Sequence, residues 1–149
     1  MYSDVVTLFC KRGKMWYPTV LRNVELNMDR GSIIKQYGAD SSDNAKLHVR
    51  YDTVGDSKMI CNKRWLPPKE WEKQGEEQLL ETFTFSSGKD FGFFLVGDWP
   101  ENAPIQDDDE KYGRNGFYNY MNTNYDYVFV ITTVGGPYTL IPHFEILGK

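Results

Sequence analysis

One segment constrains the fold more than any other, because residues 45–51 (AKLHVRY) alternate strictly between apolar and polar side chains. The apolar set is Ala45, Leu47, Val49 and Tyr51, and the polar set is Lys46, His48 and Arg50. A period of two puts these sets on opposite faces of a β-strand, with the apolar face against a core. The segment therefore predicts a half-buried strand.

Similar β-prone segments recur along the chain and are separated by Gly, Pro, Asn and Ser turn signals. They are residues 4–10, 16–26, 81–85, 91–97, 127–134 and 138–146, with a weaker one at 58–61 and a turn at Gly135–Pro137. Aromatic residues make up 15% of the 149 residues, which also favours strands. Because open sheets leave unpaired edges, we predict a mainly β single domain over 1–149, a small antiparallel β-barrel or strongly curved sheet.

Other segments interrupt this pattern. Two or three short helical insertions are expected, near residues 28–38, 67–71 and 116–121. Residues 98–124 are polar and irregular and predict one long loop, a kind of segment that is often functional. The core is predicted to contain Leu47, Val49, Tyr51, Phe83, Phe85, Val128, Val130 and Ile146.

The composition is that of a globular protein, with 40% hydrophobic and 26% charged residues. The longest apolar run, 91–96, is far shorter than the roughly 20 residues that span a bilayer, and residues 1–4 show no secretory signal. No membrane partner is therefore expected. Cys10 and Cys61 suit neither a disulfide framework nor a metal cluster, and we interpret both as buried, reduced thiols.

Sequence motifs for catalysis are missing. The only two histidines are His48, on the polar face of its strand, and His143, which follows Pro142. Neither belongs to a zinc-binding spacing, and the chain has no nucleophile elbow and no phosphate-binding glycine loop. We expect no catalytic residue, no metal and no cofactor, so the chain is not expected to be an enzyme. A hydrolase of unknown type ranks last among the hypotheses.

Charge is distributed unevenly along the chain. Residues 1–75 carry 13 basic and 9 acidic residues, whereas residues 76–149 carry 4 and 12. The acidic run Asp107, Asp108, Asp109 and Glu110 is interpreted as a solvated loop. A candidate basic contact surface comprises Lys63, Arg64, Lys69 and Lys73. Glu70 and Glu72 dilute it, so contact with DNA is possible in principle but is not predicted.

A resemblance rests on nine segments that follow one another in a characteristic order. They are 16–21 (WYPTVL), 27–30 (NMDR), 35–45 (KQYGADSSDNA), 48–51 (HVRY), 66–71 (LPPKEW), 88–91 (GKDF), 117–121 (FYNYM), 125–132 (YDYVFVIT) and 141–146 (IPHFEI). In these segments the chain resembles an uncharacterised family of small proteins encoded by tailed phages and prophages of Gram-positive bacteria. In outline it is also similar to head–tail connector proteins of the stopper or adaptor type, which are small β-barrels stacked in a ring below the portal.

The resemblance implies a structural protein of the virion, made in the host cytoplasm. Its partners would be portal or adaptor and tail proteins, and further copies of itself in a ring. The alternative hypothesis is a phage-encoded inhibitor that binds a host defence protein as an acidic mimic of nucleic acid. Gene neighbours and the protein content of purified particles would separate the two.

The candidate interface lies in residues 98–124. Its residues are Trp99, Tyr112, Phe117, Tyr118 and Tyr120, together with the acidic residues 107–110. Ordering a loop costs roughly 1–2 kcal/mol per residue, and aromatic contacts with a partner can offset that cost. We therefore predict that residues 98–124 are the most mobile internal segment of a monomeric free chain and become ordered at an interface.

Overall fold

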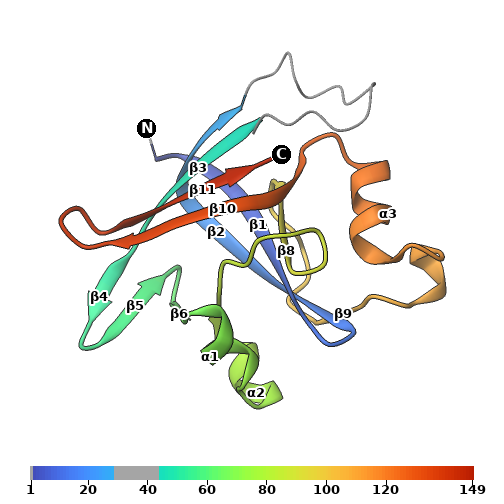
Figure 1. The fold of residues 1–149 in the computed structure, drawn as a ribbon, viewed down its shortest axis with the longest axis horizontal. Coiled ribbons are helices and arrows are strands. Elements are labelled where there is room, and N and C mark those ends of the chain that lie inside the picture. The colour runs from blue at the N-terminus through green and yellow to red at the C-terminus, as the bar shows by residue number, and fades with distance from the viewer. Residues whose placement is uncertain (1, 29–43) are drawn as a thin grey trace.

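Six antiparallel strands close into a barrel in the computed structural model, which describes residues 2–28 and 44–149 (Figure 1). The strands follow the order β1, β8, β10, β11, β3 and β2, and β2 pairs back with β1. They are β1 (Asp4–Arg12), β2 (Met15–Met28), β3 (Ala45–Arg50), β8 (Gly92–Val96), β10 (Val128–Tyr138) and β11 (His143–Gly148). The predicted mainly β barrel is confirmed. The helical turns expected over residues 28–38 lie almost wholly outside the described residues.

A small second sheet and two short helices extend from one end of the barrel. The sheet holds β4 (Asp52–Val54), β5 (Ser57–Ile60), β6 (Lys63–Trp65) and β7 (Thr82–Phe83), and α1 (Pro68–Glu72) and α2 (Glu76–Leu79) connect β6 to β7. Helix α1 begins with proline in its first turn, as predicted, because that position needs no N–H donor. The strand predicted over 81–85 is only two residues long and pairs in parallel with β6.

Residues 98–124, which we call the side layer, contain regular secondary structure rather than one long loop. They form β9 (Ile105–Gln106), the 3₁₀ helix η2 (Glu110–Tyr112) and α3 (Gly116–Asn124). The helix predicted near 116–121 is confirmed. Figure 1 shows this layer on one side of the barrel, and strand β9 attaches it by pairing with the start of β2.

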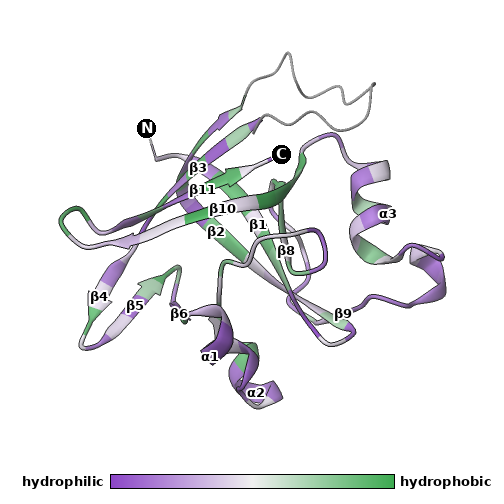
Figure 2. Cartoon of the chain, viewed as in Figure 1, coloured by the Kyte–Doolittle hydropathy of each residue, from purple (hydrophilic) through white to green (hydrophobic). Residues whose placement is uncertain are grey.

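The barrel interior is filled by the alternating inward residues of its strands. Strand β3 shows the predicted pattern, with Ala45, Leu47 and Val49 buried and the intervening residues more exposed. Figure 2 shows the apolar residues concentrated in the barrel strands. The interior residues with at most 1% exposure on β1, β3, β8, β10 and β11 are Val6, Leu8, Cys10, Leu47, Val49, Phe94, Phe129, Ile131, Phe144 and Ile146.

Four strands also bury part of their outer faces. Phe9 on β1, Trp16 on β2, Phe93 on β8 and Val128 on β10 belong to a second cluster, between the barrel and the side layer. Seven of the eight predicted core residues are buried, and the exception is Val130, which is only half-buried. Val130 shares the outer face of β10 with Val128, and Phe129 and Ile131 point inward in its place.

Strand β10 runs further than predicted. Gly135, Gly136 and Pro137 do not turn the chain but continue the strand to Tyr138 across an irregularity in the pairing with β11. Gly136 adopts a φ of +104°, which side-chain-bearing residues rarely adopt, and this lets the strand pass the irregularity. The reversal instead occurs at residues 139–142, which we call the hairpin tip, and the last strand is correspondingly shorter than predicted.

Candidate functional site

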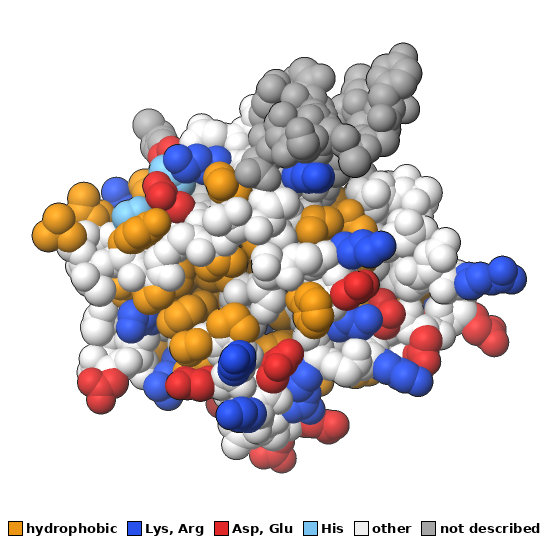
Figure 3. Space-filling model, viewed as in Figure 1, with side chains coloured by type: hydrophobic (Ala, Val, Ile, Leu, Met, Phe, Trp, Pro, Cys, Tyr) orange, Lys and Arg blue, Asp and Glu red, His pale blue; other side chains and the backbone are white. Residues whose placement is uncertain are grey.

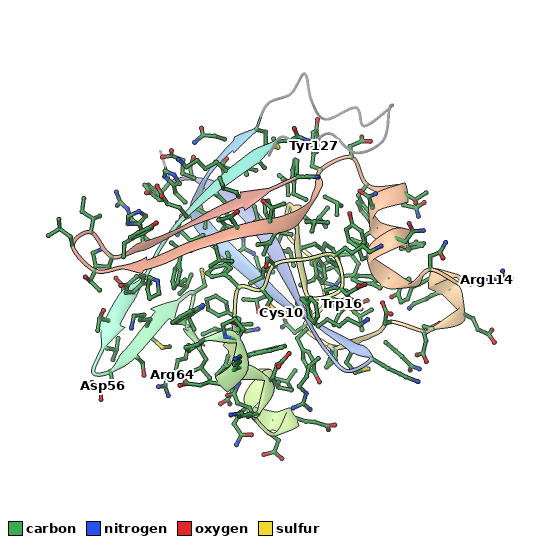
Figure 4. All side chains as sticks on the ribbon, viewed as in Figure 1. Cys10, Trp16, Asp56, Arg64, Arg114 and Tyr127 are labelled. Carbon is green, nitrogen blue, oxygen red and sulfur yellow. The ribbon has the colours of Figure 1, made fainter. Side chains whose placement is uncertain are left out.

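Asp107 links the side layer to the barrel. Its Oδ1 accepts hydrogen bonds from Trp16 Nε1 at 2.8 Å and from the backbone N of Phe117 at 3.0 Å. Its Oδ2 lies 3.3 Å from Lys11 Nζ. Figure 4 shows Trp16 on the side of the barrel that faces α3. The interpretation of Asp107 as part of a solvated loop is therefore wrong, because barrel and helix donors surround this carboxylate.

The ionisation of Asp107 reflects these contacts. Burial by itself would raise the pKa of the carboxyl group, but the hydrogen bonds from Trp16 and Phe117 and the charge of Lys11 outweigh burial and lower the pKa. Gly116, which precedes Phe117, has a φ of +87°, and a Cβ there would lie 2.8 Å from Asp107 Oδ1. Glycine is thus required for the helix to begin against this carboxylate.

The other three residues of the acidic run remain near the surface and have separate roles. Asp108 accepts a hydrogen bond from Gln106 Nε2 at 2.7 Å, and its other oxygen lies 3.6 Å from Lys14 Nζ. Asp109 caps η2 by accepting from the backbone N of Lys111 at 3.2 Å. Glu110, the first residue of η2, is exposed. The run is therefore not one uniform acidic patch.

The aromatic residues predicted as a partner interface pack against their own barrel. Phe117 is fully buried, with its ring centroid 5.3 Å from that of Phe9, 6.1 Å from Trp99 and 4.8 Å from Tyr112. Tyr118 and Tyr120 are half-buried against the same cluster, as are Trp99 and Tyr112. Phe117 has no surface to offer a partner in this conformation, and the other four offer only part of theirs.

Among the four predicted basic residues, Lys63 differs from the other three in its contacts and burial. Lys63 Nζ donates to Thr19 Oγ1 at 3.1 Å and to Pro18 O at 3.3 Å, and burial lowers its pKa. Arg64, Lys69 and Lys73 are exposed. Figure 4 shows Arg64 on the small sheet, at the molecule's edge. Since Lys63 contacts the barrel, it is not available as an exposed contact to a phosphate.

The two cysteines differ. Cys10 is buried and its thiol donates to Thr84 O at 2.9 Å, and burial raises its pKa to about 12. Cys61 is exposed, so the prediction that both thiols are buried is wrong for Cys61. Cys61 and Asn62 form the tight turn between β5 and β6, with φ angles of 50° and 66°. The side chain of Cys61 therefore lies at the surface. Within the described ranges, no three His, Cys, Asp or Glu side chains are arranged to hold a metal ion.

The two histidines meet on the outer face of the barrel, which the sequence analysis missed. Glu145 Oε1 lies 3.4 Å from His48 Nε2 and 3.9 Å from His143 Nε2. The register of β3 against β11 pairs Glu145 with His48 and explains this convergence. His143 Nδ1 also donates to the carbonyl of Ile141 at 2.6 Å and so fixes one side of the hairpin tip.

The hairpin tip carries the most exposed aliphatic side chains described. Leu140 is 97% exposed and Ile141 is 66% exposed, at the end of the hairpin formed by β10 and β11. The tip backbone is nonetheless held in place, because Pro142 O accepts from the backbone N of Tyr51 at 3.3 Å. The Tyr51 hydroxyl also donates to Tyr138 O at 2.8 Å. The tip is thus an apolar and anchored projection.

An apolar groove of about 660 Å³ lies between α1 and β10. The apolar side chains that line it are Trp65, Pro67, Pro68, Phe85, Phe91 and Val134. Lys69 and Glu72 of α1 also line it, and Phe91 is 53% exposed. Figure 3 shows hydrophobic side chains gathered on this face between β10 and α1, and others protruding at the left, where the β10–β11 hairpin ends.

Comparison with known proteins identifies a family but no characterised relative. No curated protein and no solved structure matches the chain. Among the helices in the described part, none has the length and apolar character needed to cross a membrane. The profile of one family, described as a family of unknown function (DUF6751), matches residues 1–149. The match extends over the whole chain, which therefore belongs to this family of unknown function.

Proposed function

We propose that the chain is a structural protein of a tailed-phage particle, a head–tail connector component of the stopper kind. In this proposal it assembles as a ring between a portal or adaptor ring and the tail. The single observation that carries the assembly role is the projecting hairpin tip, with Leu140 97% and Ile141 66% exposed. The phage assignment rests on the resemblance of the segments described above.

The tip is well suited to bind another protein. Burying Leu140 and Ile141 completely would gain about 1.5–3 kcal/mol for each side chain. The backbone contacts from Tyr51 and His143 hold the tip in one conformation, so little ordering cost opposes binding. Two adjacent exposed aliphatic side chains give an assembling subunit apolar surface that a neighbour can cover.

Leu140 and Ile141 alone would give only a weak contact between two proteins. A stable protein–protein interface usually buries about 1,200–2,000 Å², far more than two side chains provide. Free subunits would then remain monomeric, and contacts would add up only when a portal or adaptor ring holds several subunits together. This behaviour suits a connector, which must not polymerise before its template is present.

Partners and location follow from this assignment. The partners would be portal or adaptor proteins, tail proteins and further copies of the chain, and the assembled protein would reside in the virion after synthesis in the host cytoplasm. Contact with DNA is not part of the proposal, because Lys63 contacts Pro18 and Thr19 rather than joining the exposed Arg64, Lys69 and Lys73.

The inhibitor hypothesis has weaker support. An acidic mimic of nucleic acid presents unpaired negative charge, but Asp107 is bound to Lys11 and Trp16. Asp108 lies within 3.6 Å of Lys14 Nζ, so two of the four charges in the acidic run have basic neighbours in the chain itself. We therefore favour the connector assignment.

Mass spectrometry of purified particles tests the proposal. We expect the chain in particles released by a host whose phage encodes it, in a constant ratio to the portal protein, and its gene beside portal, capsid and tail genes. Leu140→Asp should give a folded chain that is missing from the particles. Leu80→Asp is the matched control, because Leu80 is 47% exposed on the C-terminal side of α2. Absence of the unmodified chain from the particles would overturn the proposal.

A further inference from the structure

We propose that the hairpin tip of one copy inserts into the apolar groove of a second copy, so that successive copies join head to tail. This inference rests on the proposed function, in that both require self-association, and it names the two surfaces that meet. The tip is residues 139–142, and the groove is the one between α1 and β10.

The groove has the size and chemistry of a binding site for a short apolar segment. Its volume of about 660 Å³ lies within the range of about 300–1,000 Å³ typical of ligand sites. Aromatic and proline side chains form most of its walls. Phe91 leaves more than half of its surface in water, so an apolar occupant of the groove would cover it.

A chain cannot fill its own groove with its own tip. Val134 and Gly136 of β10 line the groove, and the tip begins only three residues beyond Gly136. Strand β10 carries the tip away from α1, as Figure 1 shows. The pairing of Tyr138 with His143 and the bond from Tyr51 to Pro142 would have to break before the tip could fold back. A tip that enters this groove must therefore belong to another molecule.

A second copy supplies an occupant that matches the groove. The tip sequence, Thr139–Leu140–Ile141–Pro142, carries no charge. The groove is lined by one cation, Lys69, and one anion, Glu72, so it has no net charge either. An uncharged aliphatic tip can enter without leaving a charge unpaired, whereas a charged peptide would have to bury its charge.

The geometry of the contact defines the assembly. Tip and groove are different surfaces, so the contact is heterologous and each bound copy leaves one tip and one groove open. Such a contact closes into a ring when the rotation between neighbours divides a full turn. One contact is too small to hold a dimer at low concentration, which agrees with a free monomer that assembles on a template.

Complementation between two variants tests this arrangement. Leu140→Asp damages the tip and leaves the groove intact, whereas Ser87→Trp fills the groove and leaves the tip intact; Ser87 is exposed and lines the groove. By sedimentation velocity at high concentration, each variant alone should stay monomeric. A mixture should form 1:1 heterodimers and nothing larger, because each pair has one working tip and one working groove. Heterodimers that fail to form, or either variant associating like the unmodified chain, would overturn the proposal.

Cross-linking provides a second measurement, because a disulfide can trap a contact that is too weak to isolate. In a Cys61→Ser background, Leu140→Cys and Ser87→Cys are combined in one chain and oxidised at millimolar concentration. We expect a ladder of covalent oligomers at least tenfold more abundant than with Leu80→Cys and Ser87→Cys, the matched control. Equal ladders would contradict the proposal.

The complementation experiment has a substitute variant. Phe91→Ser replaces Ser87→Trp if the tryptophan variant does not fold.

The outcomes separate this inference from the proposed function. A cross-linked ladder from a chain that is absent from particles would support the contact and contradict the virion role. A chain present in particles but without the cross-link would support the virion role and contradict the contact. A third outcome is possible in particles. If the cysteine of Ser87→Cys forms its disulfide with a different protein rather than with the cysteine of Leu140→Cys in a second copy, the groove binds that protein and the proposal of a second copy is wrong.

Discussion

The side layer and the hairpin tip both carry conspicuous apolar side chains, but only the tip leaves them in water. In the side layer, Phe117 is fully buried and the other aromatic residues are half-buried against the barrel. At the tip, Leu140 and Ile141 are the most exposed of the large hydrophobic side chains described. The comparison shows that residue type alone does not reveal which apolar side chains stay exposed, because the aromatic side chains pack on the barrel and the aliphatic ones of the tip do not.

The difference has a structural cause. Strands β1 and β8 present Phe9 and Phe93 on the outer face of the barrel, and α3 lies where it can cover them. Asp107 then joins the layer to the barrel through Trp16 and Lys11. The tip extends past the end of β3, and within residues 2–28 and 44–149 nothing covers Leu140, which is 97% exposed.

The largest effect is expected for truncation in the side layer. Phe117→Ala should lower the free energy of unfolding by about 3–5 kcal/mol, because it opens a cavity among Phe9, Trp99 and Tyr112. Urea unfolding followed by tryptophan fluorescence measures this. A loss below about 1 kcal/mol would mean that the side layer is not a structural part of the domain, and the comparison would fail.

A smaller effect is expected for the polar link. Asp107→Asn keeps the shape of the side chain but removes the negative charge that faces Lys11. An amide NH₂ group, which donates hydrogen bonds, takes the place of one carboxylate oxygen, which accepts them. We expect a loss of about 1–3 kcal/mol by the same urea measurement. Asp108→Asn is the matched control, since Asp108 is half-exposed, and it should change the stability by less than about 0.5 kcal/mol.

The effect of Asp107→Asn should also depend on pH in a definite direction. The pKa of Asp107 is lowered in the folded state relative to the unfolded value of about 3.9. Its charged form therefore stabilises the protein above about pH 4, and this contribution disappears as the pH falls through the folded-state pKa. The stability difference between unmodified protein and variant should shrink between about pH 5 and pH 2. A difference that grows on acidification would show that the charged form is not favoured by folding.

The smallest effect on stability is expected at the tip. Leu140→Ala should change the free energy of unfolding by less than about 0.5 kcal/mol, because the side chain is 97% exposed. A loss as large as that of Phe117→Ala would show that the tip packs within its own molecule. A small change in stability combined with lost self-association would instead sharpen the contrast between the two regions.

The barrel was predictable because its strands carry clear periodic signals. The alternation over residues 45–51 identified β3 together with its inward face. On β1, β8 and β10 the apolar runs are continuous rather than alternating, which is the pattern of a strand buried on both faces. That pattern indicates that a further layer covers these strands, although it does not identify residues 98–124 as that layer.

The site was less predictable, because its features depend on long-range contacts. The bond from Asp107 to Trp16 and the approach of His48 to Glu145 depend on the register between distant strands. The exposed tip was missed for a local reason, because Gly135–Pro137 carries the usual signals of a turn. These three residues instead belong to β10, whose pairing with β11 is irregular between Gly135 and Tyr138. The chain reverses at residues 139–142, which carry weaker turn signals.

The closing of the barrel also bears on how the chain reaches its folded state. The hairpins β1–β2 and β10–β11 pair nearby residues and should each form in about 1–10 μs. The seam between β3 and β11 joins Leu47 to Ile146, so it can close only after most of the chain has been arranged. Such non-local pairing is typical of folding in milliseconds to seconds. Until the seam closes, β3 and β11 have free edges, so we expect crowded refolding to produce strand-exchanged oligomers that are unrelated to the native assembly.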